Sequence, residues 1–222
     1  MEDLRYFIWF IIMKNTVIYI HGKNGNADEA KFYKPLFTGN DVIGLEYKAE
    51  TPWQARTEFP KLFEKLCADS KKIIIIANSI GAYFTMHSLA DRQIDKAFFI
   101  SPIVDMERLI LDMMKWAGVS ENELAQHGET KTDFGETLSW EYLCYVRKHP
   151  IEWHIPTEIL YGENDSLTSL ETITAFAERT GMGLTVMPCG EHWFHTEEQM
   201  RFLTEWLVKA RTQQAVCGKN VY

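Results

Sequence analysis

Ser79 is the residue in this sequence that is best placed for covalent chemistry. It lies in the segment Ala77-Asn78-Ser79-Ile80-Gly81, directly after four consecutive isoleucines at 73–76 and before helix-compatible residues. A serine on a sharp turn between a buried strand and a helix can attack an acyl carbon if a base takes its proton. Such a turn is strained and needs small neighbours, which Gly81 and Ala77 provide, although alanine replaces the commoner glycine at 77. The segment therefore predicts a nucleophilic serine.

A base and an acid for this serine follow two later strand-like segments. Asp165 comes after the segment at 157–161, and His192 comes after the one at 183–187. We predict that His192 takes the serine proton. Asp165 would hold the imidazole in the correct tautomer and stabilise the imidazolium without itself being protonated.

Each of these two assignments has a rival close by in the sequence. His195 could be the base, but it lies almost in the cap of the following helix, whereas His192 follows the last strand by way of Gly190-Glu191. Glu163 could replace Asp165 as the acid, but it lies nearer its strand. We favour His192 and Asp165.

These side chains need a sheet to bring them together, and the hydrophobic pattern supplies one. The pattern alternates between strands and helices, which indicates an α/β fold with a mostly parallel sheet flanked by helices. Proline at 52 and a capping box from Thr51 to Gln54 open one helix, which we expect Pro60 to kink. Predicted strands cover 16–20, 41–47, 73–76, 94–100, 157–161 and 183–187, and predicted helices cover 27–36, 51–68, the residues after Ser79, 168–181 and the residues after 196.

The alternation is interrupted between about 105 and 153. Helical patterns cover 106–116, 120–125 and 137–147 there, without a strand. An insertion at the carboxyl end of a strand lies where ligands bind in α/β sheets. We interpret it as a short helical lid on a single domain that spans 1–222 and whose core covers about 14–104 and 155–210.

Composition limits the classes of function. The 222 residues are 46% hydrophobic, carry a net charge of −8 and have a pI near 5.4, which argues against binding to nucleic acid. Four cysteines without paired spacing predict free thiols in a reducing compartment, hence the cytoplasm.

The apolar run at 6–13 is well short of the ~20 residues that span a bilayer, so we expect no membrane span. Because its flank is acidic and no cleavage site follows, a secretory signal is disfavoured, and residues 1–13 are either an N-terminal extension or a first strand.

With these segments assembled, the chain resembles the α/β-hydrolase superfamily, specifically its small single-domain serine hydrolases of esterase or thioesterase type. The resemblance runs from about 16 to 207, and Ser79, Asp165 and His192 occur in the chain order that this fold uses. It implies an oxyanion hole made by the backbone N–H groups of Lys23 and Ile80, with His21 shaping the loop. The resemblance rests on I-H-G-K-N-G at 20–25, A-N-S-I-G at 77–81, Y-G-E-N-D at 161–165 and G-E-H-W-F at 190–194.

The expected function is hydrolysis of a carboxylic ester or thioester with a small-to-medium acyl group, through an acyl-enzyme on Ser79 and without a cofactor. The expected partner is a small-molecule acyl substrate, which we predict contacts Asn24, Met106 and Trp193. The oligomeric state is not predicted. Alternatives are a peptidase, an acyltransferase or a carbon–carbon bond hydrolase with the same triad, and a non-catalytic binding module on the same fold.

Nucleotide and metal chemistry fit the sequence less well. Residues 22–25, Gly-Lys-Asn-Gly, match neither G-x-G-x-x-G nor G-K-[ST]. His192 and His195 lack a third ligand in any nearby motif and do not form H-E-x-x-H. We therefore predict no metal.

Overall fold

The computed structural model describes residues 14–212, so residues 1–13 and Cys217 lie outside the described part of the chain. The elements, in chain order, are β1 (Lys14–Ile20), η1 (Ala27–Glu29), α1 (Ala30–Tyr33), η2 (Lys34–Phe37), β2 (Asp41–Gly44), α2 (Pro52–Cys67), β3 (Ser70–Asn78), α3 (Ser79–Ser88), β4 (Lys96–Ile100), α4 (Met106–Ala117), α5 (Glu121–His127), β5 (Glu129–Lys131), β6 (Thr137–Ser139), α6 (Trp140–Lys148), β7 (Thr157–Gly162), α7 (Leu170–Thr180), β8 (Gly183–Met187) and α8 (Glu197–Thr212).

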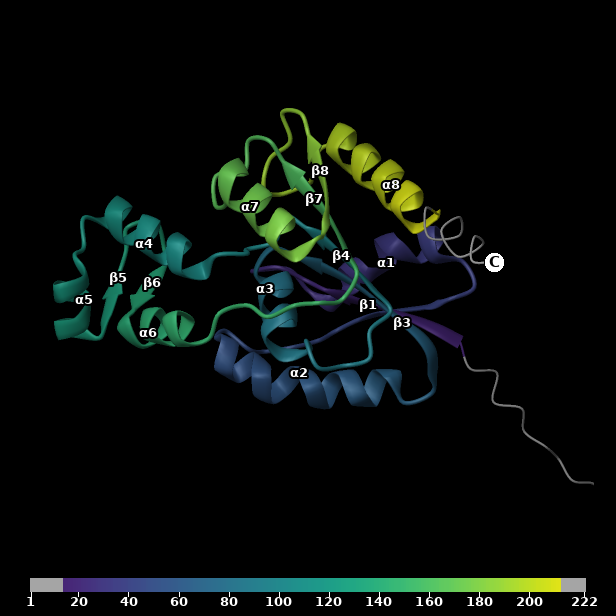
Figure 1. The fold of residues 1–222 in the computed structure, drawn as a ribbon, viewed down its shortest axis with the longest axis horizontal. Helices are drawn as coiled ribbons and strands as arrows, with labels where there is room; N and C mark the ends of the chain where they lie inside the picture. Colours follow the sequence, from purple (N-terminus) through teal and green to yellow (C-terminus); the bar gives the residue numbers. More distant parts are fainter. Residues whose placement is uncertain (1–13, 213–222) are drawn as a thin grey trace, which may run out of the picture.

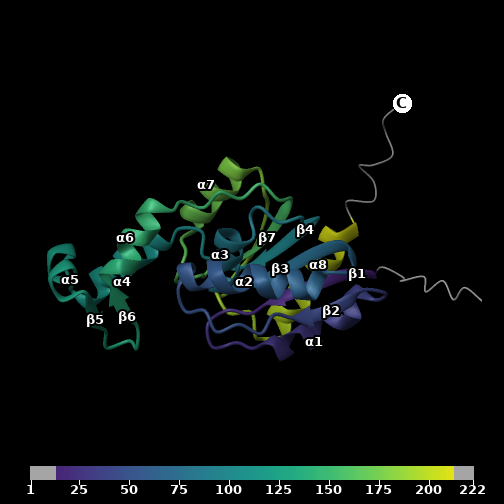
Figure 2. The same ribbon diagram turned by 90° about the horizontal axis from the view of Figure 1, so that it is seen from below.

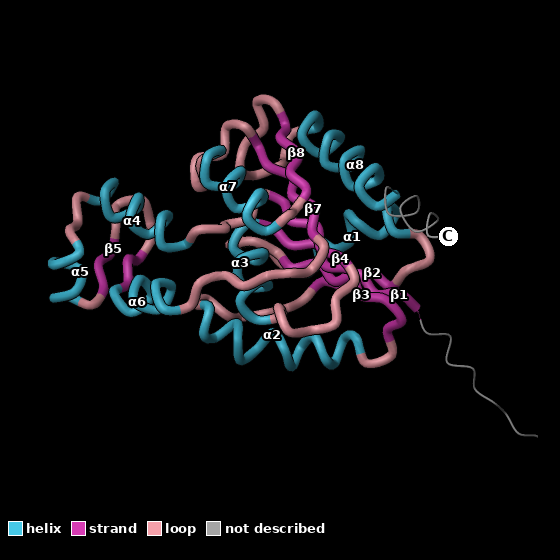
Figure 3. The backbone as a smooth tube through the Cα atoms, viewed as in Figure 1, coloured by secondary structure: helices cyan, strands magenta, loops and turns pink. Residues whose placement is uncertain are grey.

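Six strands form the central sheet in the order β2-β1-β3-β4-β7-β8, and each neighbouring pair is parallel. Figure 3 shows these strands stacked side by side between the helices. The predicted α/β class with a mostly parallel sheet is thereby confirmed. Because the strands are parallel, the loops after β1, β3, β7 and β8 leave the sheet at the same edge.

Different helices cover the two faces of the sheet (Figures 1 and 2). One core includes side chains from α2, α3 and α7, and the other includes side chains from α1 and α8. Successive strand residues point to opposite faces, so Ile75 belongs to the first core and Ile76 to the second. Burial on both faces explains why residues 73–77 of β3 are an unbroken apolar run.

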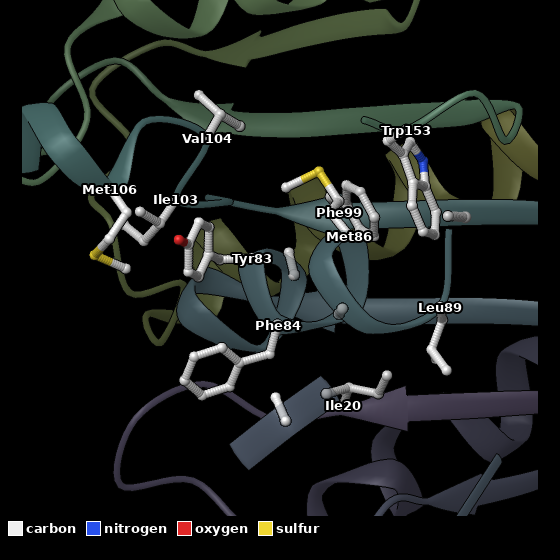
Figure 4. Close-up of a cluster of buried hydrophobic side chains, with 14 of the residues drawn as sticks. Ile20, Tyr83, Phe84, Met86, Leu89, Phe99, Ile103, Val104, Met106 and Trp153 are labelled. Carbon is white, nitrogen blue, oxygen red and sulfur yellow. The ribbon is translucent and has the colours of Figure 1, made fainter. Parts of the chain in front are cut away.

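The first core continues under the segment that returns from the insertion. Figure 4 shows Trp153 and Phe99 near Met86 of α3, and the rings of Trp153 and Phe99 lie 5.6 Å apart between centroids. Trp153 is buried, and its Nε1 donates to Thr157 Oγ1 at 2.8 Å, so the indole keeps a polar partner in the core.

The lid insertion, defined as residues 105–153, holds α4, α5 and α6, which gather at one end of the molecule (Figures 1 and 2). The prediction that this segment lacks a strand was wrong, because β5 and β6 pair as an antiparallel hairpin. Gly135 supplies a positive φ of 84° in the turn, which a glycine adopts without steric cost. Ser139 then accepts a hydrogen bond from Tyr142 N, so α6 begins at Trp140 rather than at Thr137.

Other predicted boundaries shift by a few residues. β2 ends at Gly44 instead of residue 47, and β4 begins at Lys96 instead of residue 94. The predicted helix over 27–36 is divided into three short consecutive helices, η1, α1 and η2, and Pro35 lies in the first turn of η2. Helix α7 is capped by Ser169 and begins at Leu170, two residues after the predicted start at 168. The predicted capping box at Thr51 is confirmed, and Ser120 forms a second one with Glu123 at the start of α5. Pro60 lies inside α2, which continues through it.

Candidate active site

Ser79 is the first residue of α3 and lies in the left-handed region, with φ 48°. The turn is crowded on both sides. A Cβ on Gly22 would lie 3.3 Å from the Ser79 Cβ, and a Cβ on Gly81 would lie 2.2 Å from the carbonyl oxygen of His21. The small residues around Ser79 therefore allow α3 to pack directly against the loop that follows β1.

The loops after β7 and β8 also depend on close backbone contact. A Cβ on Gly162 would lie 2.4 Å from the Glu191 carbonyl oxygen, and Gly190 lies against Gly162 in the same way. Asn164 N donates to Gly190 O at 2.7 Å, which ties the two loops together. This contact places the residues that follow, Asp165 and His192, beside each other.

Ser79, His192 and Asp165 form a continuous hydrogen-bonded series. His192 Nε2 lies 2.8 Å from Ser79 Oγ, and His192 Nδ1 lies 2.7 Å from Asp165 Oδ2. The side chain of Asp165 is fully buried, and its other oxygen accepts from Leu167 N at 2.8 Å and from Thr168 N at 3.1 Å. These bonds hold the Asp165 side chain in place, so that it can orient the imidazole as a base toward the serine.

The rival residues have other partners. The Glu163 carboxylate accepts a hydrogen bond from Cys189 N at 2.8 Å. This bond stabilises the loop that carries His192. His195 Nδ1 lies 2.7 Å from the Trp193 carbonyl oxygen, and its ring stacks on Trp193 at 4.5 Å. Neither hydrogen bond involves Ser79.

Residues with a strained backbone lie at the carboxyl-end edge of the sheet, where Ser79 also lies. In residues 14–212 the non-glycine residues with positive φ are Asn24, Ser79, Ser101 and Cys189. They follow β1, β3, β4 and β8, and so lie in the loops at the carboxyl ends of these strands. Strain of this kind is costly and concentrates at functional sites.

The two N–H groups expected to form an oxyanion hole lie on either side of the Gly22–Ser79 contact. Ile80 is the second residue of α3, so its N–H has no partner within the helix and lies at the positive end of the helix dipole. The Lys23 N–H makes no hydrogen bond to any group in residues 14–212. His21 supports this loop, since its ring stacks on Tyr47 at 4.2 Å and its carbonyl accepts from Tyr47 OH at 2.8 Å.

A buried tyrosine joins the serine turn to the loop after β1. Asn78 Nδ2 donates to Tyr19 OH at 2.9 Å, and Tyr19 OH donates to the Glu29 carboxylate. Glu29 in turn accepts from Asn26 N at 3.1 Å. Burial, with Tyr33 nearby, raises the pKa of Tyr19 and keeps its phenol a neutral donor.

Sequence reasoning missed this Tyr19–Glu29–Asn78 network. The spacing of Asn26 and Glu29 is a capping-box signature that could have revealed one contact in it. Nothing local marks Tyr19, because its partner Asn78 is 59 residues away.

The three residues expected to contact substrate lie in different settings. Met106, the first residue of α4, is buried near Tyr83 and Ile103 (Figure 4). Trp193 is 73% exposed beside His192, and Asn24 is exposed with φ 62°. Their contacts with a substrate stay predictions.

An ion pair joins the lid insertion to the loop after β1. Lys23 Nζ bonds the carboxylate of Glu136, which lies in the turn between β5 and β6. The side chain of Lys23 is 55% exposed, so the pair itself contributes little stability. It does bring the hairpin beside the loop that carries the Lys23 N–H, a contact that no sequence signal indicated.

Among residues 14–212 no group of three or more His, Cys, Asp or Glu side chains is arranged to hold a metal ion. Within the same range no helix has the length and apolar character needed to cross a membrane.

The sequence matches no family model, and no curated protein gives a significant match. Solved structures do match. Alpha/beta hydrolase domain-containing protein 10 from mouse aligns with TM-score 0.70 and 15% identity over 90% of each chain. Est1E from Butyrivibrio proteoclasticus with bound ferulic acid aligns with TM-score 0.70 and 16% identity over 91% of this chain and 90% of its own. The thioesterase domain from the curacin biosynthetic pathway aligns with TM-score 0.57 and 13% identity over 88% of this chain and 91% of its own. The chain therefore has the α/β-hydrolase fold.

Proposed function

We propose that this chain, which has the α/β-hydrolase fold, is a single-domain serine hydrolase that cleaves a carboxylic ester or thioester with a small-to-medium acyl group. The observation that carries the proposal is the hydrogen-bonded series from Ser79 Oγ through His192 to the buried Asp165 carboxylate. A serine alone is a poor nucleophile at neutral pH, and this arrangement provides the base that it lacks.

In the proposed reaction, Ser79 Oγ attacks the acyl carbon while His192 Nε2 takes the serine proton. The N–H groups of Ile80 and Lys23 stabilise the negative charge that forms on the carbonyl oxygen. Each of these donors lowers the activation free energy by about 3 kcal/mol. His192 then gives the proton to the leaving alcohol or thiol, which leaves an acyl-enzyme on Ser79. Water attacks this ester with His192 again as base, and the acid product departs. No step needs a cofactor.

The substrate class is inferred from two kinds of support. Est1E, solved with ferulic acid, and a thioesterase domain are among the solved structures with this fold, which suggests an ester or thioester. The lid insertion is short, and its hairpin lies beside the Lys23 loop, which favours a small-to-medium acyl group.

The proposed location of the protein is the cytoplasm. The free thiols of Cys67, Cys144 and Cys189 fit this location, because it is a reducing compartment.

The test is covalent labelling by a fluorophosphonate, read by intact mass and followed over time. We expect one adduct on the wild type and none on Ser79→Ala. His192→Gln should lower the labelling rate by at least about 10³-fold, because the serine loses its base. His195→Gln is the matched control and should label at the wild-type rate, since its ring bonds the Trp193 carbonyl and not Ser79.

Hydrolysis of p-nitrophenyl esters and acyl thioesters of increasing chain length would then define the substrate. A folded wild type that takes no adduct would contradict the proposal and favour a binding module. Equal losses in His192→Gln and His195→Gln would contradict the assignment of the base.

A further inference from the structure

Lys23 connects two parts of the molecule, one through its backbone and one through its side chain. Its N–H belongs to the segment packed on the serine turn, because a Cβ on the preceding Gly22 would lie 3.3 Å from the Ser79 Cβ. Its side-chain ammonium bonds both carboxylate oxygens of Glu136, in the turn between β5 and β6. One residue therefore joins a proposed oxyanion donor to the lid insertion.

Between residues 22 and 25 the loop after β1 has few restraints of its own. Gly25 N donates to Gly22 O at 3.2 Å, across a turn in which Asn24 has φ 62°. Lys23 and Asn24 are exposed, and neither makes a backbone hydrogen bond within residues 14–212. The ion pair with Glu136 is thus the contact that restrains the exposed side of this turn.

The Glu136 end of the ion pair is held firmly. Thr132 N donates to Glu136 O at 2.8 Å, and Glu136 N donates to Thr132 Oγ1 at 3.0 Å. The Glu136 side chain is 34% exposed, against 55% for Lys23, so the carboxylate is the more enclosed partner. A fixed acid therefore restrains a more mobile lysine.

The lid helices are bonded to one another by Arg147 of α6. Its Nε donates to Glu107 of α4 at 2.7 Å, and its two terminal nitrogens donate to Glu121 of α5 at 2.7 and 2.9 Å. The hairpin follows α5 and leads directly into α6, and Figure 1 shows these elements gathered at one end of the molecule. The position of Glu136 therefore follows the position of the whole lid insertion.

We propose that Glu136 is a positioning residue for the reaction at Ser79. Through the Lys23 side chain it holds the Lys23 N–H where the oxyanion forms, so the lid insertion takes part in assembling the oxyanion hole. This inference rests on the proposed function. An exposed ion pair contributes little to the stability of the fold, but the same small contribution changes the population of an ordered loop severalfold. The expected signature is a lower kcat in a variant whose stability is unchanged.

Steady-state hydrolysis of an activated ester tests the proposal with two variants. Glu136→Gln removes the carboxylate, and Lys23→Gln removes the ammonium but keeps the backbone N–H. Each should lower kcat by about fivefold and leave KM and the urea midpoint of unfolding unchanged, because the donor acts only in the transition state.

Asp133→Asn is the matched control for Glu136→Gln. Asp133 is exposed in the same turn, and it forms no ion pair within residues 14–212. The control removes one negative charge from the hairpin without touching Lys23, so it should keep the wild-type kcat.

Two further results show whether Lys23 and Glu136 act through one contact. The double variant Lys23→Gln/Glu136→Gln should lose no more kcat than either single variant, because both changes break the same ion pair. Raising sodium chloride from about 0.05 M to about 0.5 M should lower the wild-type kcat toward that of Glu136→Gln and change the variant much less, since salt screens an exposed pair. Additive losses in the double variant would overturn the proposal.

NMR of the free protein reports on the loop without any reaction. The Lys23 amide resonance should shift in Glu136→Gln and its heteronuclear NOE should fall, whereas both should stay unchanged in Asp133→Asn. An unaltered Lys23 amide in Glu136→Gln contradicts the inference. An active wild type whose kcat equals that of Glu136→Gln also contradicts it and leaves the proposed function standing. A folded wild type that takes no fluorophosphonate adduct and cleaves no ester overturns the proposed function, and this inference with it.

Discussion

Ser79 and the groups around it show how the local chemistry depends on residues that are far apart in sequence. Its hydroxyl meets His192 across 113 residues, and its turn is joined through Asn78 and Tyr19 to Glu29. Glu29 also accepts from Asn26 N, in the loop that carries the Lys23 N–H. The network therefore fixes the distance between the two segments that supply the proposed oxyanion donors. We regard Tyr19 as a positioning residue.

Tyr19→Phe should lower kcat on an activated ester by about tenfold and leave KM nearly unchanged, because misplaced donors weaken binding of the transition state only. The measurement is steady-state kinetics on a substrate that the wild type hydrolyses. Tyr83→Phe is the control, since Tyr83 is equally buried and its hydroxyl has no hydrogen-bond partner in residues 14–212. An equal loss of kcat in both variants, or a loss confined to thermal stability, would refute a positioning role.

At the scale of elements, the site depends on the meeting of the loops after β7 and β8. Gly162 and Gly190 allow the two backbones to touch, and the bond from Asn164 N to Gly190 O holds them together. Asp165 and His192 lie just beyond this contact. The relative position of Asp165 and His192 is thus set by backbone packing between two strand ends.

Gly162→Ala should separate these loops, because the added Cβ would lie within 2.6 Å of backbone atoms of Gly190 and Glu191. We expect a loss of about 1–3 kcal/mol in the free energy of unfolding, together with a loss of fluorophosphonate labelling per folded molecule. Gly181→Ala provides the comparison: Gly181 caps α7 with φ 70° and has no atom near its Cβ position, so it should cost about 1 kcal/mol and leave labelling intact. Labelling retained in folded Gly162→Ala would show that the contact is dispensable.

At the scale of the whole molecule, charge is distributed unevenly. The chain is acidic overall, yet Arg56, Arg92 and Lys148 line the same cavity as the half-buried His87, where the core joins the lid insertion. This arrangement affects stability. The folded pKa of His87, about 4, lies below its ordinary value of 6.5, so the unfolded chain binds more protons between these pH values.

The contribution of His87 to the free energy of unfolding should therefore fall as the pH drops from about 6.5 to 4, by at most about 3 kcal/mol. Urea unfolding of the wild type and of His87→Gln, at several pH values in this window, measures the difference. The variant should lose less stability than the wild type on acidification. Parallel pH profiles would mean that His87 is not buried as described.

The sequence by itself determined the features that arise from short-range patterns. The isoleucine run before Ser79, the capping box at Thr51 and the order of strands and helices are local, and they predicted the parallel α/β fold correctly. Boundaries at 41–47 and 94–100 were less accurate, because strand ends are set by pairing with neighbours rather than by composition. Asp165 and His192 could be chosen over Glu163 and His195 only by their places in their loops.

The tertiary structure decided whatever depends on contacts between distant segments. It brings Ser79, His192 and Asp165 into hydrogen-bond contact, gives Glu163 a partner in Cys189, and sets the β5–β6 hairpin beside Lys23. The Tyr19 network and the cavity at His87 arise in the same way, from side chains supplied by several elements. No short-range pattern records such contacts, because the free energy that fixes them comes from packing and hydrogen bonds formed only when the whole chain folds.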